Sequence, residues 1–225
     1  MGKYKIASRF IEYYRRHGVL ETCARIWLAM ERAVWRGGLI LFYSASDEIP
    51  EAEGNNQTIP LEIEQIHREE DIPDLALKRI LQHWNERLMK RHIKERFEKG
   101  ARLWLAKVEK DYAGFGWSIV GTSIEPYFFP LSNSDAHLFN FHIFPEYRGN
   151  GINPLLVNHM LLVLKNEKIN RALIETNTWN KAQIRSLEKT YFHKLGRARK
   201  ITILGKTIVI WLQLEKPFGH GWPND

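Results

Sequence analysis

Apolar residues in the first part of the chain recur every three or four positions between Arg9 and Trp35. This is the spacing of one helix face, so the pattern predicts helical structure there. Gly18 interrupts the pattern and is expected to divide the segment into two helices. The next run, Gly37–Ala45 (GGLILFYSA), is continuously apolar, and its length fits a short strand.

From Leu61 onward the apolar pattern switches between a period of two and a period of three to four. Asp71 is expected to cap a helix with Pro73 in its first turn, and Asn85–Lys99 to form a second helix that ends at Gly100. Further helices are predicted over 148–168 and 180–192. Strands are predicted over 61–66, 101–110, 114–129, 137–144 and 171–176, and as a closing hairpin over 199–214. Strands that gather first and then alternate with helices indicate an α/β or α+β fold with a mixed sheet.

The stretch SDEIPEAEGNNQTIP, at 46–60, contains two prolines, Gly54 and an Asn-Asn pair, which are typical of a linker. We place a domain boundary there. The predicted organisation is a basic helical extension over 1–50 that ends in a short strand, a linker over 51–60, a main domain over 61–215 and a tail over 216–225.

The net charge of +7 is unevenly distributed along the 225 residues. Residues 1–36 hold eight Lys or Arg against three Glu, and 78–110 hold eleven basic against four acidic residues. Residues 47–74 hold ten acidic residues and a single Arg. A basic excess suits a polyanionic ligand, an anionic membrane surface or simply a solvated face. The basic residues accompany no groove-reading or base-stacking motif, so no nucleic-acid partner is expected.

Other features of the composition narrow the class of protein. The single Cys23 permits no internal disulfide, and no Cys/His cluster has metal-ligand spacing, so no metal is expected. No window reaches the roughly 20 apolar residues that a membrane-spanning helix needs. The charged N-terminus lacks a signal-peptide core, and we expect a cytoplasmic protein. Four tryptophans in apolar segments are expected in the core: Trp27, Trp104, Trp117 and Trp211.

The stretch FPEYRGNGINPLL, from Phe144 to Leu156, joins a predicted strand to a predicted helix. Gly149 and Gly151 stand two apart, and Pro154 lies in the first helical turn. This arrangement directs unpaired N–H groups and the positive end of the helix dipole at one point. Glycines let a phosphate approach those groups closely, and Arg148 adds a positive charge. The alternative is a tight turn with no ligand.

This junction resembles the acyl-CoA signature of the GNAT superfamily of N-acyltransferases, Arg/Gln-x-x-Gly-x-Gly/Ala. Arg148, Gly151 and Asn153 occupy its defined positions, with Asn153 where the family has a small residue. Asn180 stands where the family has its motif asparagine. The resemblance extends over 61–214 and implies a mixed, mostly antiparallel central sheet flanked by helices, with the N-terminal residues as an extra helical segment.

The resemblance also implies how acetyl-CoA, as co-substrate, would be held. The pantetheine arm would pair with the strand edge at His142, Ile143 and Phe144, and an N–H near Ile143 would stabilise the oxyanion. Asn180 belongs to the same site. The pyrophosphate would lie against backbone N–H groups of one loop: Arg148, Gly149, Asn150, Gly151, Ile152 and Asn153.

Proton transfer needs a base with a pKa near neutrality, because the amine acceptor arrives as an ammonium. His137 is the first candidate, directly or through water, since the resemblance places a base near this position and a histidine has a suitable pKa. His142, Asp135 and Glu125 remain alternatives. The family's usual acid, a tyrosine, is replaced by Leu187, so Tyr191, four residues on, becomes the candidate for protonating the thiolate.

The acceptor is expected to be a small primary amine, and an amino sugar of surface-polysaccharide biosynthesis is one hypothesis. Trp179 and the aromatic loop SIEPYFFPLSNSD, at 123–135, are candidates to line its pocket. Residues 1–36 could pack on the sheet, form a homodimer surface, dock the acceptor or contact a membrane peripherally. The alternative function is a non-catalytic acyl-CoA-binding or scaffold protein with a degenerate site.

Overall fold

A computed structural model describes residues 18–21, 38–51, 60–124, 131–203 and 206–214. Its centre is one sheet of eight strands in the order β2-β3-β4-β5-β6-β1-β7-β8. All neighbouring pairs are antiparallel except β5 and β6, which run parallel. The strands are β1 (Gly38–Ala45), β2 (Leu61–Ile66), β3 (Arg102–Val108), β4 (Asp111–Val120), β5 (Asp135–Ile143), β6 (Arg171–Asn177), β7 (His193–Ile203) and β8 (Lys206–Leu214).

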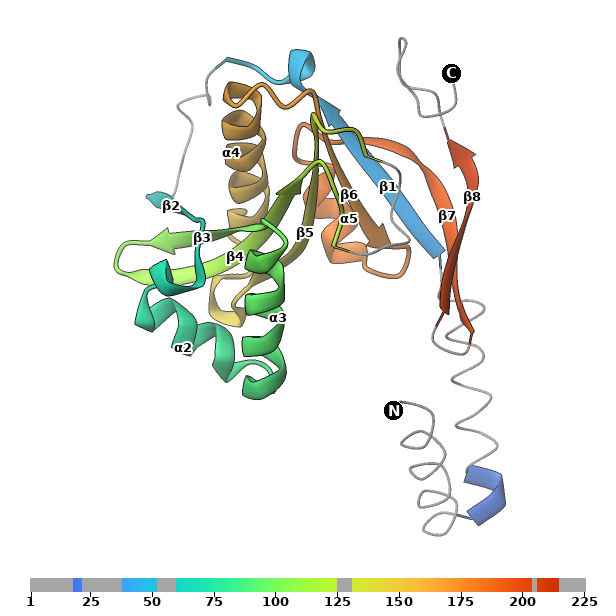
Figure 1. Ribbon diagram of the computed structural model, residues 1–225, viewed down its shortest axis with the longest axis horizontal. Helices are drawn as coiled ribbons and strands as arrows, with labels where there is room; N and C mark the ends of the chain where they lie inside the picture. Colours follow the sequence, from blue (N-terminus) through green and yellow to red (C-terminus); the bar gives the residue numbers. More distant parts are fainter. Residues whose placement is uncertain (1–17, 22–37, 52–59, 125–130, 204–205, 215–225) are drawn as a thin grey trace.

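Helices cover both faces of this sheet (Figure 1). On one face lie α4 (Ile152–Asn166) and α5 (Lys181–Leu187), whose buried residues share a core with Trp104. On the other lie α2 (Asp74–Gln82) and α3 (Glu86–Glu98), which pack on a core that contains Trp117. Both tryptophans are 1% exposed, which confirms their predicted place in the core. Short 3-10 turns span Ser46–Glu48, Glu69–Asp71 and Pro145–Tyr147.

Strand β1 lies inside the sheet, between β6 and β7. Hydrophobic side chains cover both of its faces, and Leu39, Leu41 and Phe42 are each at most 5% exposed. This explains the continuous apolar run in the sequence, because a strand covered on both faces has no solvent side. The boundary predicted at 51–60 therefore does not separate β1 from the sheet built by the later residues. Apart from the placement of β1, the predicted division of the chain into an extension, a linker, a main domain and a tail remains a prediction.

Several element ends differ from the sequence prediction. Asp71 caps no α-helix, because it ends a 3-10 turn and Pro73 is the N-cap of α2. Helix α5 ends at Leu187, before the predicted end at 192, and β7 begins at His193, before the predicted start of the hairpin at 199. Strand β4 ends at Val120, and residues 125–130 lie outside the described part.

The predicted extent of α3 is close to the observed one. The Asn85 side chain accepts a hydrogen bond from the Leu88 N–H at 3.0 Å, and ion pairs such as Glu86–Lys90 lie one turn apart along its outer face.

The predicted helices between Arg9 and Trp35 lie outside the described residues, apart from 18–21, which are helical. Gly18, at the start of this piece, has a φ of 76°, a value that interrupts a right-handed helix. None of the described helices is long and apolar enough to cross a bilayer.

Candidate active site

The parallel contact between β5 and β6 lasts for only three residue pairs, Asp135–His137 against Arg171–Leu173. Beyond them the two strands diverge, each still paired on its outer side with β4 or β1. Asn140 contributes to the divergence: its φ is 54°, and the β4–β5 register shifts beside it. The inner edges of both strands are therefore available to a ligand on the side where they separate.

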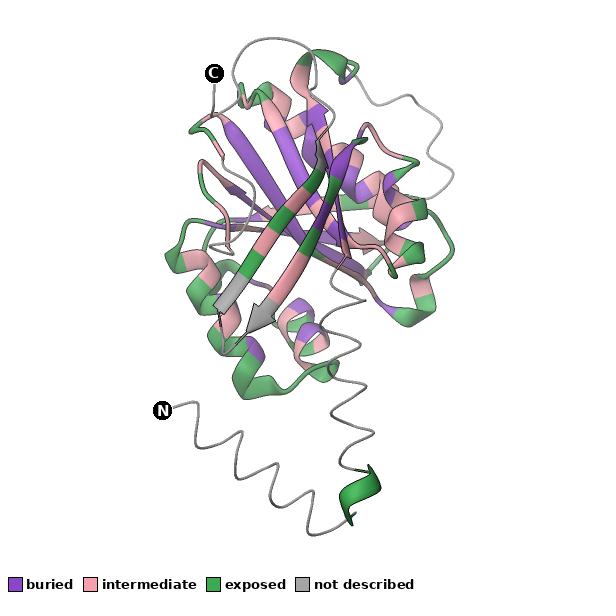
Figure 2. Ribbon diagram, turned by 90° about the vertical axis from the view of Figure 1, so that its right-hand side faces the viewer, coloured by how far each residue is buried: buried purple, intermediate pink, exposed green. Residues whose placement is uncertain are grey.

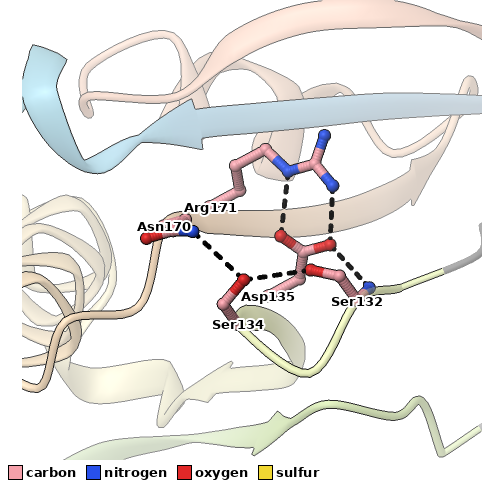
Figure 3. A network of polar contacts seen from close by, with 5 residues as sticks. All are labelled: Ser132, Ser134, Asp135, Asn170 and Arg171. Atoms are coloured by element: carbon pink, nitrogen blue, oxygen red, sulfur yellow. Dashed lines mark hydrogen bonds and ion pairs between the residues drawn. The ribbon is translucent and has the colours of Figure 1, made fainter. Parts of the chain in front are cut away.

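An ion pair between a buried carboxylate and a partly exposed arginine fixes the closed end of this divergence (Figure 3). Arg171 donates from Nε and Nη2 to the two carboxylate oxygens of Asp135, both at 2.8 Å, and the Ser132 N–H donates to Oδ2 at 2.8 Å. Burial would raise the pKa of the Asp135 carboxyl, but the hydrogen bonds from Arg171 and Ser132 outweigh it and lower the pKa. Asp135 is thus a structural carboxylate and does not suit the role of base.

The glycine junction forms the N-terminus of α4. Gly151 is the N-cap with a φ of 75°, and Gly149 has a φ of 86°. A Cβ built on either would meet nothing within 4 Å, so backbone conformation rather than crowding requires glycine here. The first turn of α4 holds no acidic residue that would occupy its N–H groups. An open array of donors therefore faces the space in front of the helix.

A cleft of about 370 Å³ lies at this point, between the end of β5, the N-terminus of α4 and helix α5. Its lining contains three cations, Arg148, Arg185 and Lys189, and no Asp or Glu. Eight predicted cofactor residues line it: His142, Ile143, Arg148, Gly149, Gly151, Ile152, Asn153 and Asn180. Two others do not: Asn150 is exposed on the turn, and Phe144 is buried beneath it. The charge of the cleft suits a polyphosphate.

The polar residues around the cleft hold its walls together. Arg148 donates from Nε to the Ile143 carbonyl at 2.9 Å. Asn153 donates to Ser186 Oγ at 2.7 Å and so joins α4 to α5, which explains why a larger residue stands in this turn. The Asn153 amide oxygen is buried without a hydrogen-bond partner. Asn180 caps α5 by accepting from the Gln183 N–H at 3.2 Å.

The backbone of Ile143 faces the side from which β6 has diverged. The Phe144 N–H donates to the Ala113 carbonyl at 2.9 Å, on the β4 side. Because successive residues of a strand direct their N–H and C=O groups to opposite sides, those of Ile143 point away from β4. Close packing maintains this arrangement, since a Cβ at Gly114 would lie 2.6 Å from the His142 carbonyl oxygen. The predicted oxyanion donor therefore faces the cleft side of the strand.

His142 is packed among aromatic rings, 4.6 Å from the Trp84 ring and 5.5 Å from the Phe144 ring between centroids. Burial, with the positive charge of Arg148 and the neighbouring His83, lowers the pKa of His142 to about 4. The imidazole is thus neutral near pH 7. His142 Nε2 is buried and has no hydrogen-bond partner among the described residues, so nothing there relays a proton to or from it, and His142 is not the favoured base.

His137 is fully buried on the α2/α3 side of the sheet, and its Nε2 lies 2.9 Å from Glu175 Oε2 on β6. The side chain of Glu175 is 20% exposed, against 1% for His137. The two residues form a dyad at the end of the β5–β6 pairing, in which the carboxylate is the accessible member. His137 belongs to the last pair, and Glu175 lies two residues beyond its partner Leu173. The structure places His137 behind Glu175 rather than in contact with open space.

Tyr191 lies outside the lining of the cleft. Its N–H donates to Asn158 Oδ1 at 3.1 Å, and its side chain packs against the core beneath α4. Glu125, the remaining candidate, is outside the described residues. In the described part of the chain, no group of three or more His, Cys, Asp or Glu could hold a metal ion.

Sequence reasoning missed three residues of this site: Glu175, Arg185 and Lys189. Arg185 and Lys189 are four positions apart, so their shared direction could have been read from helical spacing. Glu175 carried no such signal, because its meeting with His137 depends on the parallel pairing of two strands 38 residues apart.

The family comparison agrees with this geometry. A sequence model of the acetyltransferase (GNAT) family matches residues 62–191, more than half of the chain. The protein therefore belongs to the GNAT family of acetyltransferases. A search of curated protein sequences found no match.

Solved structures share the fold at low sequence identity. A GNAT acetyltransferase from Colwellia psychrerythraea matches with a TM-score of 0.51 and 11% identity, over 78% of this chain and 56% of that one. A glucosamine N-acetyltransferase region of a fungal multi-domain GH3 beta-N-acetylglucosaminidase matches with a TM-score of 0.52 and 9% identity, over 80% and 22%. The chain spans 56–61% of the length of the first three matched structures.

The Asp135–Arg171 pair yields a prediction for stability. Asp135→Asn should lower the free energy of unfolding by about 2–3 kcal/mol, somewhat below the range for a fully enclosed pair, because it leaves the partly exposed Arg171 without its counter-charge. Urea denaturation measures this, and Asp111→Asn, at an exposed carboxylate, is the control. Equal effects of the two substitutions would show that the pair does not stabilise the strand contact.

The lowered pKa of His142 yields a prediction for how stability depends on pH. Between the ordinary pKa of 6.5 and about 4, the unfolded chain binds a proton that the folded chain does not. Stability should therefore fall as the pH decreases through this window. His142→Phe should reduce that loss in thermal unfolding, whereas His67→Phe, at an exposed site, should leave it unchanged. If His142→Phe does not alter the wild-type dependence of thermal stability on pH, the lowered pKa of His142 would be contradicted.

Proposed function

We propose that this protein is an acyl-CoA-dependent N-acyltransferase that transfers an acetyl or short acyl group to a primary amine. The observation that carries the proposal is the cleft at the N-terminus of α4, which combines left-handed glycines, open backbone donors and a lining with cations but no carboxylates. It adjoins the strand edge that the divergence of β5 and β6 makes accessible. Membership of the GNAT family supports this reading.

The residues of the cleft fit the parts of acyl-CoA. Backbone N–H groups from Gly149 to Asn153 suit the pyrophosphate, and Arg185 and Lys189 add positive charge for the nucleotide phosphate. The β5 edge from His142 to Phe144 suits the amide-rich pantetheine arm, and the buried Asn153 oxygen can accept one further donor. When bound, acyl-CoA supplies the acyl group in an activated form, as a thioester.

Ile143 and the His137–Glu175 dyad account for the two remaining tasks, which are stabilising negative charge on the acyl oxygen and removing a proton from the amine. The Ile143 N–H, directed away from β4, can stabilise negative charge on the acyl oxygen, and such donors contribute about 3–4 kcal/mol in acyl transfer. The ammonium of the acceptor first loses a proton to solvent. Glu175 then accepts the second proton from the nitrogen as that nitrogen bonds to the acyl carbon and the carbon–sulfur bond breaks. His137 orients the carboxylate from behind. We therefore assign the base to Glu175 and a positioning role to His137, and the departing sulfur takes its proton from solvent.

The exposed side chains near the site narrow the range of amines that could be the acceptor. Trp179, 59% exposed, precedes Asn180 at the start of α5, and Trp84, 37% exposed, packs beside His142. Flat aromatic surfaces beside an acidic group suit a ring that carries an ammonium. An amino sugar meets this description and is the acceptor to test first, alongside linear amines.

Measuring CoA binding tests whether the N-terminus of α4 holds the pyrophosphate. Gly151→Val should weaken CoA binding at least about tenfold, because a β-branched residue rarely adopts a φ of 75° and the donors would turn away. Isothermal titration calorimetry gives the affinity. Gly100→Val is the matched control, since Gly100 has a φ of 82°, nothing within 4 Å of its Cβ position and a place outside the cleft. Equal affinity of both variants for CoA would rule out this role of the α4 N-terminus.

Turnover tests the dyad. Glu175→Gln should lower kcat at least about a hundredfold with little change in KM for acetyl-CoA, since general bases contribute that much or more. His137→Gln should lower kcat less and alter its pH profile. Thiol release with a panel of amines measures both, and Glu188→Gln, at an exposed carboxylate, is the control. CoA binding without thiol release from any amine would favour the alternative, a non-catalytic acyl-CoA-binding protein.

A further inference from the structure

Strand β8, at the end of the sheet order, exposes an aliphatic stripe. Ile208, Ile210 and Leu212 are 57%, 47% and 62% exposed, and the residues between them, Val209 and Trp211, are more buried. In the described part of the chain β8 pairs only with β7. Figure 2, in which this hairpin faces the viewer, shows exposed positions recurring along both strands. Exposed aliphatic side chains gathered at a sheet edge are typical of an interaction surface.

The same face of the hairpin is basic. Arg199 lies directly opposite Ile210, and directly opposed residues of an antiparallel pair share a face. Arg197 is two residues from Arg199 and therefore also on that face, and both arginines are exposed. Residues 193–214 contain five Lys or Arg and no Asp or Glu. We call the surface formed by Arg197, Arg199, Ile208, Ile210 and Leu212 the hairpin face.

We propose that the hairpin face docks on a membrane surface that contains anionic lipid headgroups. Aliphatic side chains beside arginines, with no acidic residue among them, have the chemistry of interfacial binding: the cations attract the headgroups and the aliphatic groups enter the acyl boundary. A second copy of the chain would bring two basic hairpins together. A nucleic acid would leave three aliphatic side chains without a partner, since it binds through phosphates, hydrogen bonds and base stacking.

The experiment uses the full chain and two kinds of vesicle, one of pure phosphatidylcholine and one of phosphatidylcholine mixed equally with phosphatidylglycerol. Co-sedimentation should show binding to the mixed vesicles, weaker binding at raised ionic strength, and little binding to the neutral ones.

Two pairs of substitutions assign the binding to the hairpin face. The double variant Arg197→Gln, Arg199→Gln should bind mixed vesicles about thirtyfold more weakly, since each cation near an anionic bilayer contributes about fivefold. The double variant Ile208→Thr, Ile210→Thr keeps β-branched residues in the strand and should also lose binding. Arg87→Gln and Leu75→Thr, at exposed positions on α3 and α2, are the controls and should bind as the wild type does. Unchanged thermal unfolding shows that each variant is folded.

Two results would overturn the proposal. The first is wild-type protein that binds neither vesicle, and the second is hairpin variants that bind mixed vesicles as tightly as the controls do. In the first case, self-association that Ile208→Thr, Ile210→Thr abolishes would identify a second copy as the partner, and RNA binding that the arginine substitutions abolish would identify a nucleic acid. Loss of vesicle binding in both hairpin variants, with the controls unaffected, would establish the proposal.

Discussion

The site of this protein depends on a strand pairing that stops early. Strands β5 and β6 are parallel neighbours for three residue pairs and then separate, so two strands at the centre of the sheet each acquire a free inner edge. An unpaired edge inside a sheet would ordinarily leave backbone groups without hydrogen bonds, at a cost for each buried group. A ligand with peptide-like groups can satisfy them. The ion pair between the buried Asp135 and the partly exposed Arg171 holds the two strands together at the closed end and so sets where the separation begins.

The charges around this opening are divided between its two sides. The cleft in front of α4 has cations, helix N–H groups and no carboxylate, while the opposite side of the sheet holds the His137–Glu175 dyad. Between them His142, with a pKa of about 4, remains neutral and adds no charge near the strand edge. This separation suits a reaction in which a polyanionic donor and a cationic amine approach one sheet from different sides.

The sequence predicted local features well because they depend on local chemistry. Alternation and helical spacing located most strands and helices, and Gly149, Gly151 and Pro154 located the turn into α4, since each acts through its own backbone geometry. Asn85 was recognisable as the start of α3 for the same reason. The family signature was found here because it is itself a local motif.

Features that depend on contacts between distant residues were not predictable in the same way. The apolar run at 37–45 showed a buried strand but not its place between β6 and β7. The sequence predicted His137 as a candidate base but gave no indication of its partner Glu175, because the register of a parallel pair has no local signal. Asp135 was a candidate base until its ion pair with Arg171 was seen. One sequence shows which residues can do chemistry, and the fold shows which of them meet.

Chemical-shift mapping of the backbone amides during a titration with CoA tests the central claim most directly. If the diverging strands and the α4 N-terminus form the acyl-CoA site, the largest saturable changes should fall on the amides of Ile143, Gly149, Gly151, Ile152 and Asn153. Saturable changes clustered elsewhere, for example on α2 and α3, would contradict the account, and so would the absence of any change.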